Sequence, residues 1–507
     1  MRTEKSIKNA ISAIVSNGIA IIVSFIAQAF FVRLLGKEYN GLNGLFSNII
    51  SMLSVVELGL GSALVYHLYE PLAKNDKKKI KSIMRFYRNS YRIVALIIII
   101  LSVAMLPFLN LFVNTNLDIN IYLVFLLFAV ESSSSYLLSY KRSILYADQK
   151  SYILNIIKIG YTILLNTLQV TFLLFTKNYY LYLIIKIAAR IIENLVITTI
   201  ANKKYSYLRT GNTVPLDNKT KKSITKKVKG LLFHKIGSYI VLGTDNIIIS
   251  SFINLGTVGI YANYTLITNG INAIFSQVFY SITAGIGNLL TEKRPEKSYK
   301  SYKEILLINF WITCFSCIAF YLISKPFVEM WVGPEYVLTK DITLVIMINL
   351  YLNMYGYTIG AFKTASGIFH EDRFVPILQS VTNIIVSIAL VIPFGLMGVI
   401  IGTIASTLIL YLYSYPHFVY TKLFNRKKIS YYLEFFKYIV IFAIIFTVSV
   451  LAYNAITIHV DQESVIFRLI IAACVSLLLP NIMLLVMFKN TPQFEIFKTI
   501  TKTIKTK

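Results

Sequence analysis

The chain has 507 residues, of which 56% are hydrophobic and 14% are charged, and its formal net charge is +27. Soluble domains carry about 25% charged residues, so this composition is typical of a protein that crosses a membrane many times. A basic balance also suggests nucleic-acid binding, but most of the Lys and Arg residues lie on one side of the predicted membrane, so we expect no nucleic-acid partner.

The apolar segments predict an all-α polytopic membrane protein with fourteen transmembrane helices. The first segment follows three cations, as the core of a signal peptide does. It is too long for one and lacks a small-residue cleavage site, so we expect it to be retained. The spans are predicted at residues 10–35, 41–69, 91–113, 119–140, 152–176, 181–201, 231–253, 259–290, 305–324, 341–365, 374–392, 397–417, 435–456 and 467–488.

The loop charges predict which side of the membrane each loop occupies. With the N-terminus in the cytoplasm, the inside segments hold 39 of the 50 Lys and Arg residues. The outside loops hold only Lys37, Lys177, Lys325 and Lys340. This asymmetry follows the positive-inside rule and places both termini in the cytoplasm.

The basic loop 202–230 is predicted to divide the chain into two six-helix bundles, 1–201 and 231–417, in a pseudo-two-fold arrangement. Helices 13 and 14 and a basic tail follow in 418–507. A weak internal repeat supports this division, because Leu-Gly precedes a further glycine at 35–41 and again at 255–259. Repeated bundles are typical of transporters, which place the substrate site between the repeats near the membrane centre.

The loops argue against an enzyme. The longest outside connection has about sixteen residues, and no phosphate loop of the form GxxxxGK[ST] is present, so neither a soluble catalytic domain nor an ATP-driven pump fits. Cys314 and Cys317 share a helical face inside a predicted span, where packing is expected rather than metal binding. We therefore expect no catalytic residues, no metal and no cofactor.

Charged residues lie deep in two spans, at 152–176 and 181–201. On one face of the first span lie Lys158, Asn166 and Gln169, and the second carries Lys186 and Arg190. Because a cation at the membrane centre costs about 2.5–3.5 kcal/mol, such residues normally face water or a partner. They predict either a cationic internal chamber or a pair of Arg190 with Glu193 that joins two helices.

Further polar residues complete the candidate sites. Arg33 lies near the outer end of the first span, Gln28 lies on a polar face of that span, and Asn353 belongs to a polar face of 341–365. Amides suit sugar hydroxyls, and Lys with Arg suits a pyrophosphate. Carboxylates are predicted inside the membrane at three positions, which either couple transport to H⁺ or Na⁺ or pair with cations: Glu57, Glu131 and Asp245.

Two segments resemble the bacterial polysaccharide flippases, the Wzx-like O-antigen and capsule repeat-unit transporters of the multidrug, oligosaccharidyl-lipid and polysaccharide exporter superfamily. The first is FVRLLGKEYNGLNGLF at 31–46, followed by VELGLGSA at 56–63. The second is GLLFHKIGSYIVLGTDNIIISS at 230–251, with the pair Asp245 and Asn246. Asn40 departs from the family, because many members have the neighbouring Tyr and Gly adjacent.

The resemblance implies a V-shaped pair of bundles that works by alternating access in the bacterial cytoplasmic membrane. The implied substrate is an undecaprenyl-pyrophosphate-linked oligosaccharide moved to the outer leaflet, with a polysaccharide polymerase and a chain-length regulator as partners. The cationic cavity of the family maps most naturally onto Lys158, Lys186, Arg190 and Arg33. The alternatives are a cation-coupled multidrug exporter of the same superfamily, a membrane glycosyltransferase and a structural scaffold.

Overall fold

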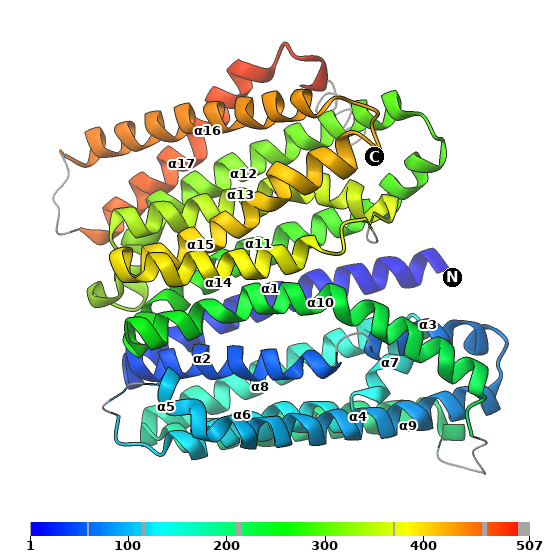
Figure 1. Cartoon of the computed structure of the whole chain (residues 1–507). Helices are drawn as coiled ribbons and strands as arrows, with labels where there is room; N and C mark the ends of the chain where they lie inside the picture. Colours follow the sequence, from blue (N-terminus) through cyan, green and yellow to red (C-terminus); the bar gives the residue numbers. More distant parts are fainter. Residues whose placement is uncertain are drawn as a thin grey trace. The chain divides into compact units, whose positions relative to one another are not determined.

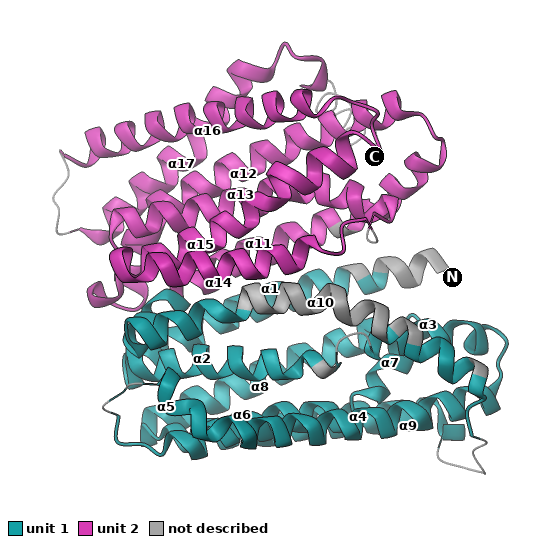
Figure 2. Ribbon diagram, in the orientation of Figure 1, with its two compact units in different colours: residues 1–262 teal, residues 263–507 magenta. Residues whose placement is uncertain are grey.

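The structure, a computed structural model, describes residues 2–57, 60–113, 115, 117–208, 215–368, 371–458 and 464–494. These residues form helices and connecting turns, and no strand occurs among them, in agreement with the predicted all-α fold (Figure 1). The chain divides into two compact units, Met1–Ala262 and Asn263–Lys507 (Figure 2).

Unit 1 is built from long helices joined by short turns and 3₁₀ segments. In chain order it contains α1 (Arg2–Leu35), α2 (Lys37–Leu53), η1 (Ser54–Glu57), α3 (Leu60–Ala73), α4 (Lys77–Met105), η2 (Leu106–Phe108), α5 (Leu109–Phe112), α6 (Ile121–Leu137), α7 (Tyr140–Ala147), α8 (Ser151–Thr176), α9 (Tyr179–Lys204), η3 (Ser206–Leu208) and α10 (Asn218–Phe252). The next helix, α11 (Leu255–Thr291), begins in unit 1 and continues into unit 2.

Unit 2 contains helices of similar length. After α11 come α12 (Pro295–Trp331), η4 (Pro334–Tyr336), α13 (Lys340–Ser366), α14 (Val375–Phe394), α15 (Leu396–Ile409), η5 (Leu410–Tyr420), α16 (Lys428–Thr457), α17 (Val465–Phe488) and η6 (Pro492–Phe494). The segment η5 is a π-helix that continues directly from α15. Here α14 packs along α15, and α12 lies against α13 and α17.

Ten helices in the described part of the chain are long and apolar enough to span a membrane, or eleven if the bent pair α6 and α7 forms one span. Each of the fourteen predicted spans coincides with helical segments, but α2 with α3, α9 and α10 are not among those ten or eleven. In α9 the reason is the charge of Lys186, Arg190 and Glu193 within one apolar run. The count of fourteen spans and the position of the termini remain predictions.

Some helices of unit 1 begin at polar side chains that accept hydrogen bonds from backbone N–H groups of the first turn. Asn120 accepts a hydrogen bond from the backbone N–H of Leu123 at the start of α6, and Asn178 does the same for Leu181 in α9. Such caps contribute about 0.5–2 kcal/mol each. Between α1 and α2, Gly36 takes φ of +89°, a left-handed conformation that glycine adopts without strain. The turn at Gly36 therefore fixes where α1 ends and α2 begins.

The two glycine positions of the internal repeat meet in unit 1, where the start of α2 crosses the start of α11. A Cβ at Gly41 would lie 2.1 Å from the carbonyl oxygen of Leu255, and one at Gly259 would lie 1.9 Å from that of Lys37. The backbones therefore approach as closely as only glycine allows. Nearby, buried Asn40 donates to the carbonyl oxygen of Gly259 at 2.7 Å.

The predicted boundary at 202–230 does not coincide with the division between the compact units. Described residues of α10, the helix expected to open the second bundle, pack against α2 in unit 1. Residues 209–214 of the predicted linker and 495–507 of the predicted tail lie outside the described residues. The division into two six-helix bundles with two added helices therefore stays a prediction.

Candidate functional site

Unit 1 contains a polar cavity of about 240 Å³ between α2, η1, α6 and α9. Three serines from α2 and η1 line one part of it, and charged groups line another. The residues that carry its chemistry are Ser47, Ser51, Ser54, Glu57, Glu131 and Lys186. Three predicted site residues, from three different segments of the chain, are thus brought to one cavity.

Glu131 is the carboxylate around which the charges of this cavity are arranged. Its side chain, which is 14% exposed, lies 3.0 Å from Nε of Arg190 and 3.8 Å from Nζ of Lys186. Both cations come from α9, whereas Glu131 belongs to α6. The ion pairs therefore join the two helices, and Lys186 also faces the cavity.

A second carboxylate lies behind the first. Glu193, whose side chain is 3% exposed, receives a hydrogen bond from Nη1 of Arg190 at 2.6 Å. It also lies 2.9 Å from Nη2 of Arg142, which comes from α7. Arg142 in turn donates to Oδ1 of Asn194. The predicted pair of Arg190 with Glu193 is present, but it lies within one helix, and the links between helices run through Glu131 and Arg142.

The resulting cluster holds three cations, Arg142, Lys186 and Arg190, and two carboxylates. Its formal charge is +1 if all five groups are ionised. Aromatic rings add to the cation environment, because the guanidinium of Arg190 lies 4.7 Å from the ring centre of Tyr161. The cluster therefore combines features of both sequence interpretations, because Lys186 faces the cavity and ion pairs hold the helices together.

Sequence reasoning missed Arg142, because residues 141–151 were interpreted as an inside loop. The structure instead forms α7 there, at a 44° bend after α6. Because of this bend, Arg142, which the sequence suggests is a basic loop residue, lies against the carboxylate of Glu193. A signal in the sequence is the spacing of Tyr140, Ile144 and Ala147, which are four and three residues apart, as on one face of a helix.

Glu57 occupies the 3₁₀ turn η1 at the edge of the same cavity. It accepts a hydrogen bond from the hydroxyl of Tyr91 at 3.2 Å. Asp245 is half-buried on α10 and does not line this cavity. Of the three carboxylates considered for ion coupling, Glu57 and Glu131 thus share one cavity.

The polar stripe of α8 lies against α1. Nζ of Lys158 donates to Oδ1 of Asn17 at 3.1 Å, and the amide of Asn155 donates to Ser12. Lys158 is exposed and does not line the cavity of unit 1. The two polar faces predicted for these spans are therefore matched to each other in the structure.

The remaining amide candidates of unit 1 have partners in the protein. Asn166 donates to the carbonyl oxygen of Thr162 one turn earlier, and buried Gln169 donates to that of Tyr182. Gln28 donates to Oδ1 of Asn40 at 3.0 Å, which ties it to the crossing of α2 and α11. These contacts are structural whether or not a substrate also reaches the amides.

Arg33, the cation predicted near the outer end of the first span, is exposed in the last turn of α1. The side chains of His234 and Lys235, which belong to the segment 230–251, lie outside the described residues. Cys314 and Cys317 are buried in α12.

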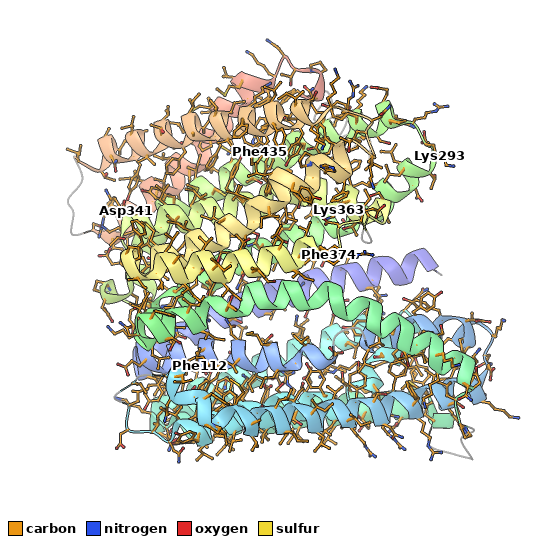
Figure 3. The ribbon with its side chains drawn as sticks, in the orientation of Figure 1. Phe112, Lys293, Asp341, Lys363, Phe374 and Phe435 are labelled. Carbon is orange, nitrogen blue, oxygen red and sulfur yellow. The ribbon has the colours of Figure 1, made fainter. Side chains whose placement is uncertain are left out.

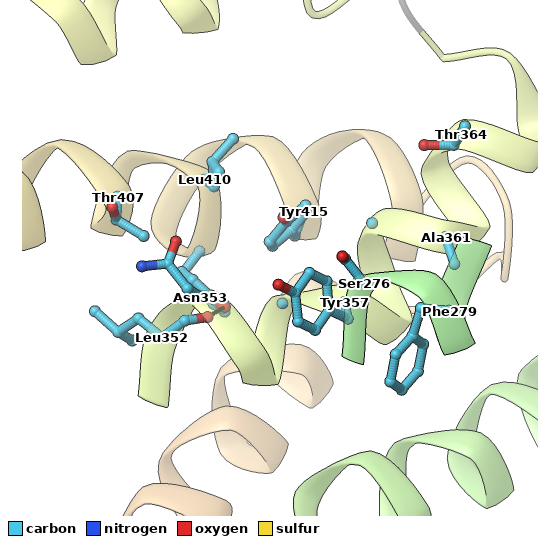
Figure 4. A pocket seen from close by; sticks show the side chains of 13 residues that line it. Ser276, Phe279, Leu352, Asn353, Tyr357, Ala361, Thr364, Thr407, Leu410 and Tyr415 are labelled. Carbon is cyan, nitrogen blue, oxygen red and sulfur yellow. Dashed lines mark hydrogen bonds between the residues drawn. The ribbon is translucent and has the colours of Figure 1, made fainter. Parts of the chain in front are cut away.

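Asn353 is the one candidate of unit 2, and it lines a second pocket of about 350 Å³. Its neighbours there come from α11, α13, α15 and η5, and they include Tyr357, Tyr411 and Tyr415 (Figure 4). No charged residue is among the groups that line this pocket in the described part of unit 2. The helix that carries Asn353, α13, has Asp341 near one end and Lys363 near the other (Figure 3).

Comparison with known proteins shows that this chain resembles several solved structures in fold. No protein-family model and no curated protein matches the sequence. Among solved structures, the lipid II flippase MurJ in an inward closed conformation is similar over 96% of this chain and 99% of its own, with a TM-score of 0.71 and 17% identity.

Exporter structures are similar over a smaller part of the chain. An inward-facing multidrug resistance MATE family transporter of the MOP superfamily has a TM-score of 0.60 and 15% identity over 78% of this chain and 95% of its own. A mutant form of the Vibrio cholerae MATE transporter VcmN has a TM-score of 0.52 and 12% identity over 80% of this chain and 95% of its own. The chain therefore has the all-helical fold of MATE and MurJ transporters.

Proposed function

We propose that this protein is a flippase for lipid-linked oligosaccharides in the bacterial cytoplasmic membrane. It moves undecaprenyl-pyrophosphate-linked repeat units from the cytoplasmic to the outer leaflet by alternating access, for capsule, O-antigen or exopolysaccharide synthesis. It does so with fourteen spans and both termini in the cytoplasm, and hands its product to a polymerase that works with a chain-length regulator. The proposal includes no chemical step, so the protein is not an enzyme.

The observation that carries this proposal is the cavity of unit 1, with the ammonium of Lys186 on its wall and the guanidinium groups of Arg190 and Arg142 paired with carboxylates behind it. A pyrophosphate presents several anionic oxygens that require charged donors once they leave water. Lys suits this task because its ammonium is a compact charge on a flexible stem, which can follow a moving ligand. Serine hydroxyls at Ser47 and Ser51 offer additional donors.

The fold similarity includes a flippase and drug exporters, and it differs between them in extent. The lipid II flippase structure matches almost the whole chain, whereas the exporter structures leave about a fifth of it unmatched. Such a likeness concerns fold alone, so the substrate is argued from the cavity.

The alternative is a cation-coupled multidrug exporter, and one observation favours it. Glu57 and Glu131 both line the cavity, and a pair of carboxylates suits an organic cation or a coupling ion. Against this, Glu131 is held by Lys186 and Arg190, so its charge is already compensated. In the flippase, we assign to Glu57 the role of candidate site for H⁺ or Na⁺ coupling.

The test is the variant Lys186→Gln, with Lys158→Gln as a matched control that removes a predicted cation outside the cavity. Losing one charge-assisted contact costs about 1.5–3 kcal/mol, so transport by the Lys186 variant should fall roughly tenfold or more. The measurement is movement of lipid-linked oligosaccharide across the membrane of proteoliposomes, with equal amounts of folded protein. Normal transport by Lys186→Gln, or equal loss in both variants, would defeat the proposed role of the cavity.

A further inference from the structure

The pocket of unit 2 has a different chemistry from the cavity assigned to the pyrophosphate. It measures about 350 Å³, and aromatic rings, hydroxyls and amides line it without a charged group among the described residues. Ligand sites commonly have volumes of about 300–1,000 Å³ and combine apolar walls with a few polar groups. Its size and lining are therefore those of a site for a small uncharged group.

Aromatic rings form much of the wall. The ring of Tyr357 stacks on that of Phe279, with centroids 5.6 Å apart and an interplanar angle of 18°. The hydroxyl of Tyr357 donates to Oδ1 of Asn272 at 3.0 Å, which fixes the ring orientation. Figure 4 shows Tyr357, Phe279 and Ser276 on one side of the pocket and Thr407 and Leu410 on the other. A fixed ring with a polar tip suits a ligand that has both an apolar face and hydroxyl groups.

The opposite wall comes from η5, whose π-helical geometry is a second, independent observation. Hydrogen bonds in a π-helix connect residues five apart, and such segments are rare and frequent at functional sites. Tyr411 and Tyr415 of this segment both line the pocket, with ring centroids 5.2 Å apart. Tyr411 is almost fully buried and donates to the carbonyl oxygen of Leu352, so this wall is rigid.

The polar groups of the pocket suit alcohols. Asn353 directs its amide N–H to the carbonyl oxygen of Asn349 on its own helix at 2.9 Å, and its side-chain oxygen is a further acceptor in the pocket lining. Hydroxyl groups of Ser276 and Thr364 also line the pocket; the Ser276 hydroxyl donates to the carbonyl oxygen of Ala273 at 3.1 Å and can accept from a ligand, and a threonine hydroxyl can both donate and accept. Sugar hydroxyls have the same dual capacity, so donors and acceptors match in either direction.

The floor of the pocket is made of glycine. A Cβ at Gly360 would meet only the hydroxyl of Tyr415, at 3.9 Å, so the space above this residue is open. The nearby cation Lys363 is engaged elsewhere, because it pairs with Asp372 and donates to Oγ of Ser414 at 3.0 Å. The pocket thus combines an open floor with an uncharged wall.

We propose that the pocket of unit 2 binds one or two sugar rings of the transported oligosaccharide, with the apolar face of a ring against the tyrosines and its hydroxyls on Asn353 and the neighbouring alcohols. This assignment rests on the proposed flippase function and adds a glycan subsite to it. The volume is at the small end of the usual range, so the subsite holds part of a repeat unit rather than the whole head group.

The test compares binding of three probes to the full-length protein in lipid nanodiscs: undecaprenyl pyrophosphate carrying a hexose, the same lipid carrying an N-acetylhexosamine, and the bare lipid. The informative variant is Gly360→Phe, which fills the pocket, and Gly360→Ala is the matched control that leaves it open. Asn353→Ala is a second variant that removes a polar group at an exposed position and is expected to fold normally.

In the unaltered protein, at least one glycosylated probe should bind about tenfold more tightly than the bare lipid. Gly360→Phe should abolish this preference while bare-lipid binding stays unchanged, Asn353→Ala should reduce the preference, and Gly360→Ala should keep it. The inference is overturned if no glycosylated probe is preferred, or if the preference survives in both Gly360→Phe and Asn353→Ala. Failure of the bare lipid to bind at all would instead count against the proposed function, and tight binding of a cationic dye abolished by Gly360→Phe would assign the pocket to organic cations.

Discussion

The two units offer pockets of opposite chemistry. In unit 1 the cavity wall carries Lys186 and Glu131, and Arg190 and two further charged groups lie behind it. In unit 2 the buried pair of Lys363 and Asp372 lies outside the pocket, whose lining is tyrosine, amide, hydroxyl and glycine. A substrate with a charged pyrophosphate and an uncharged glycan needs both kinds of surface, and the difference separates electrostatic binding from recognition of hydroxyl groups.

The largest loss of stability is expected when the ion pairs that join the helices of unit 1 are broken. Arg190→Met removes the guanidinium that joins Glu131 on α6 to Glu193 on α9, and leaves each carboxylate with one cation instead of two. Losing a hydrogen bond to a charged group costs about 1.5–3 kcal/mol, and this variant loses two such bonds. Thermal unfolding of the purified protein in detergent should show a marked loss of stability.

The control for that variant is Lys74→Met, which breaks an exposed pair with Glu70. Exposed pairs of this kind contribute little to stability because water and salt screen the two charges, so its unfolding temperature should barely change. Equal shifts for the two variants would mean that the cluster of unit 1 is no more structural than a surface ion pair.

A smaller effect is expected from the geometry of the unit 2 pocket. Gly356→Ala would place a Cβ 2.6 Å from the hydroxyl of Tyr411, which is buried and hydrogen-bonded and therefore cannot move away easily. Overpacking of this kind costs about 1–3 kcal/mol. Gly360→Ala meets no such contact and should leave stability unchanged or raise it by about 0.5–1 kcal/mol, because alanine favours helices. Thermal unfolding of the two variants checks this contrast, and a more stable Gly356→Ala protein would show that the tyrosine wall is not rigid.

The smallest effect distinguishes the two pockets by their response to salt. Binding of bare undecaprenyl pyrophosphate should weaken several-fold between about 0.05 and about 0.5 M salt, because partly exposed charges are screened. The preference for a glycosylated probe should stay constant within about twofold, since uncharged contacts are not screened in this way. Titrations of both lipids at each salt concentration provide the measurement. If the preference falls in parallel with bare-lipid binding, recognition of the pyrophosphate and recognition of the glycan would both depend on charge.

Much of the unit 1 site could be predicted from the sequence. Cations and carboxylates within apolar runs are conspicuous, and helical spacing showed that Lys186 and Arg190 share a face. Periodicity identifies a face, but it does not identify the neighbour of that face. For this reason the polar stripe with Lys158 was predicted on the chamber wall, whereas the structure pairs it with Asn17 of α1.

Other features depend on long-range packing or on local backbone geometry. Asn40, which the sequence marks as a departure from the resembling family, bridges Gln28 and the carbonyl oxygen of Gly259, a residue more than two hundred positions away. The segment that carries Tyr411 and Tyr415 is a π-helix, a backbone geometry that no residue pattern in the sequence indicates. The all-α fold follows from hydropathy, but such contacts follow only from the folded chain.

The central claim is that this protein carries lipid-linked glycans across the membrane. The most direct test is mass spectrometry of these lipids, combined with their leaflet accessibility, in cells depleted of the protein. The account predicts that glycosylated undecaprenyl pyrophosphate builds up in the cytoplasmic leaflet, and its mass would then identify the repeat unit. Unchanged lipid-linked glycans, together with increased sensitivity to cationic dyes, would contradict the account and support the drug exporter.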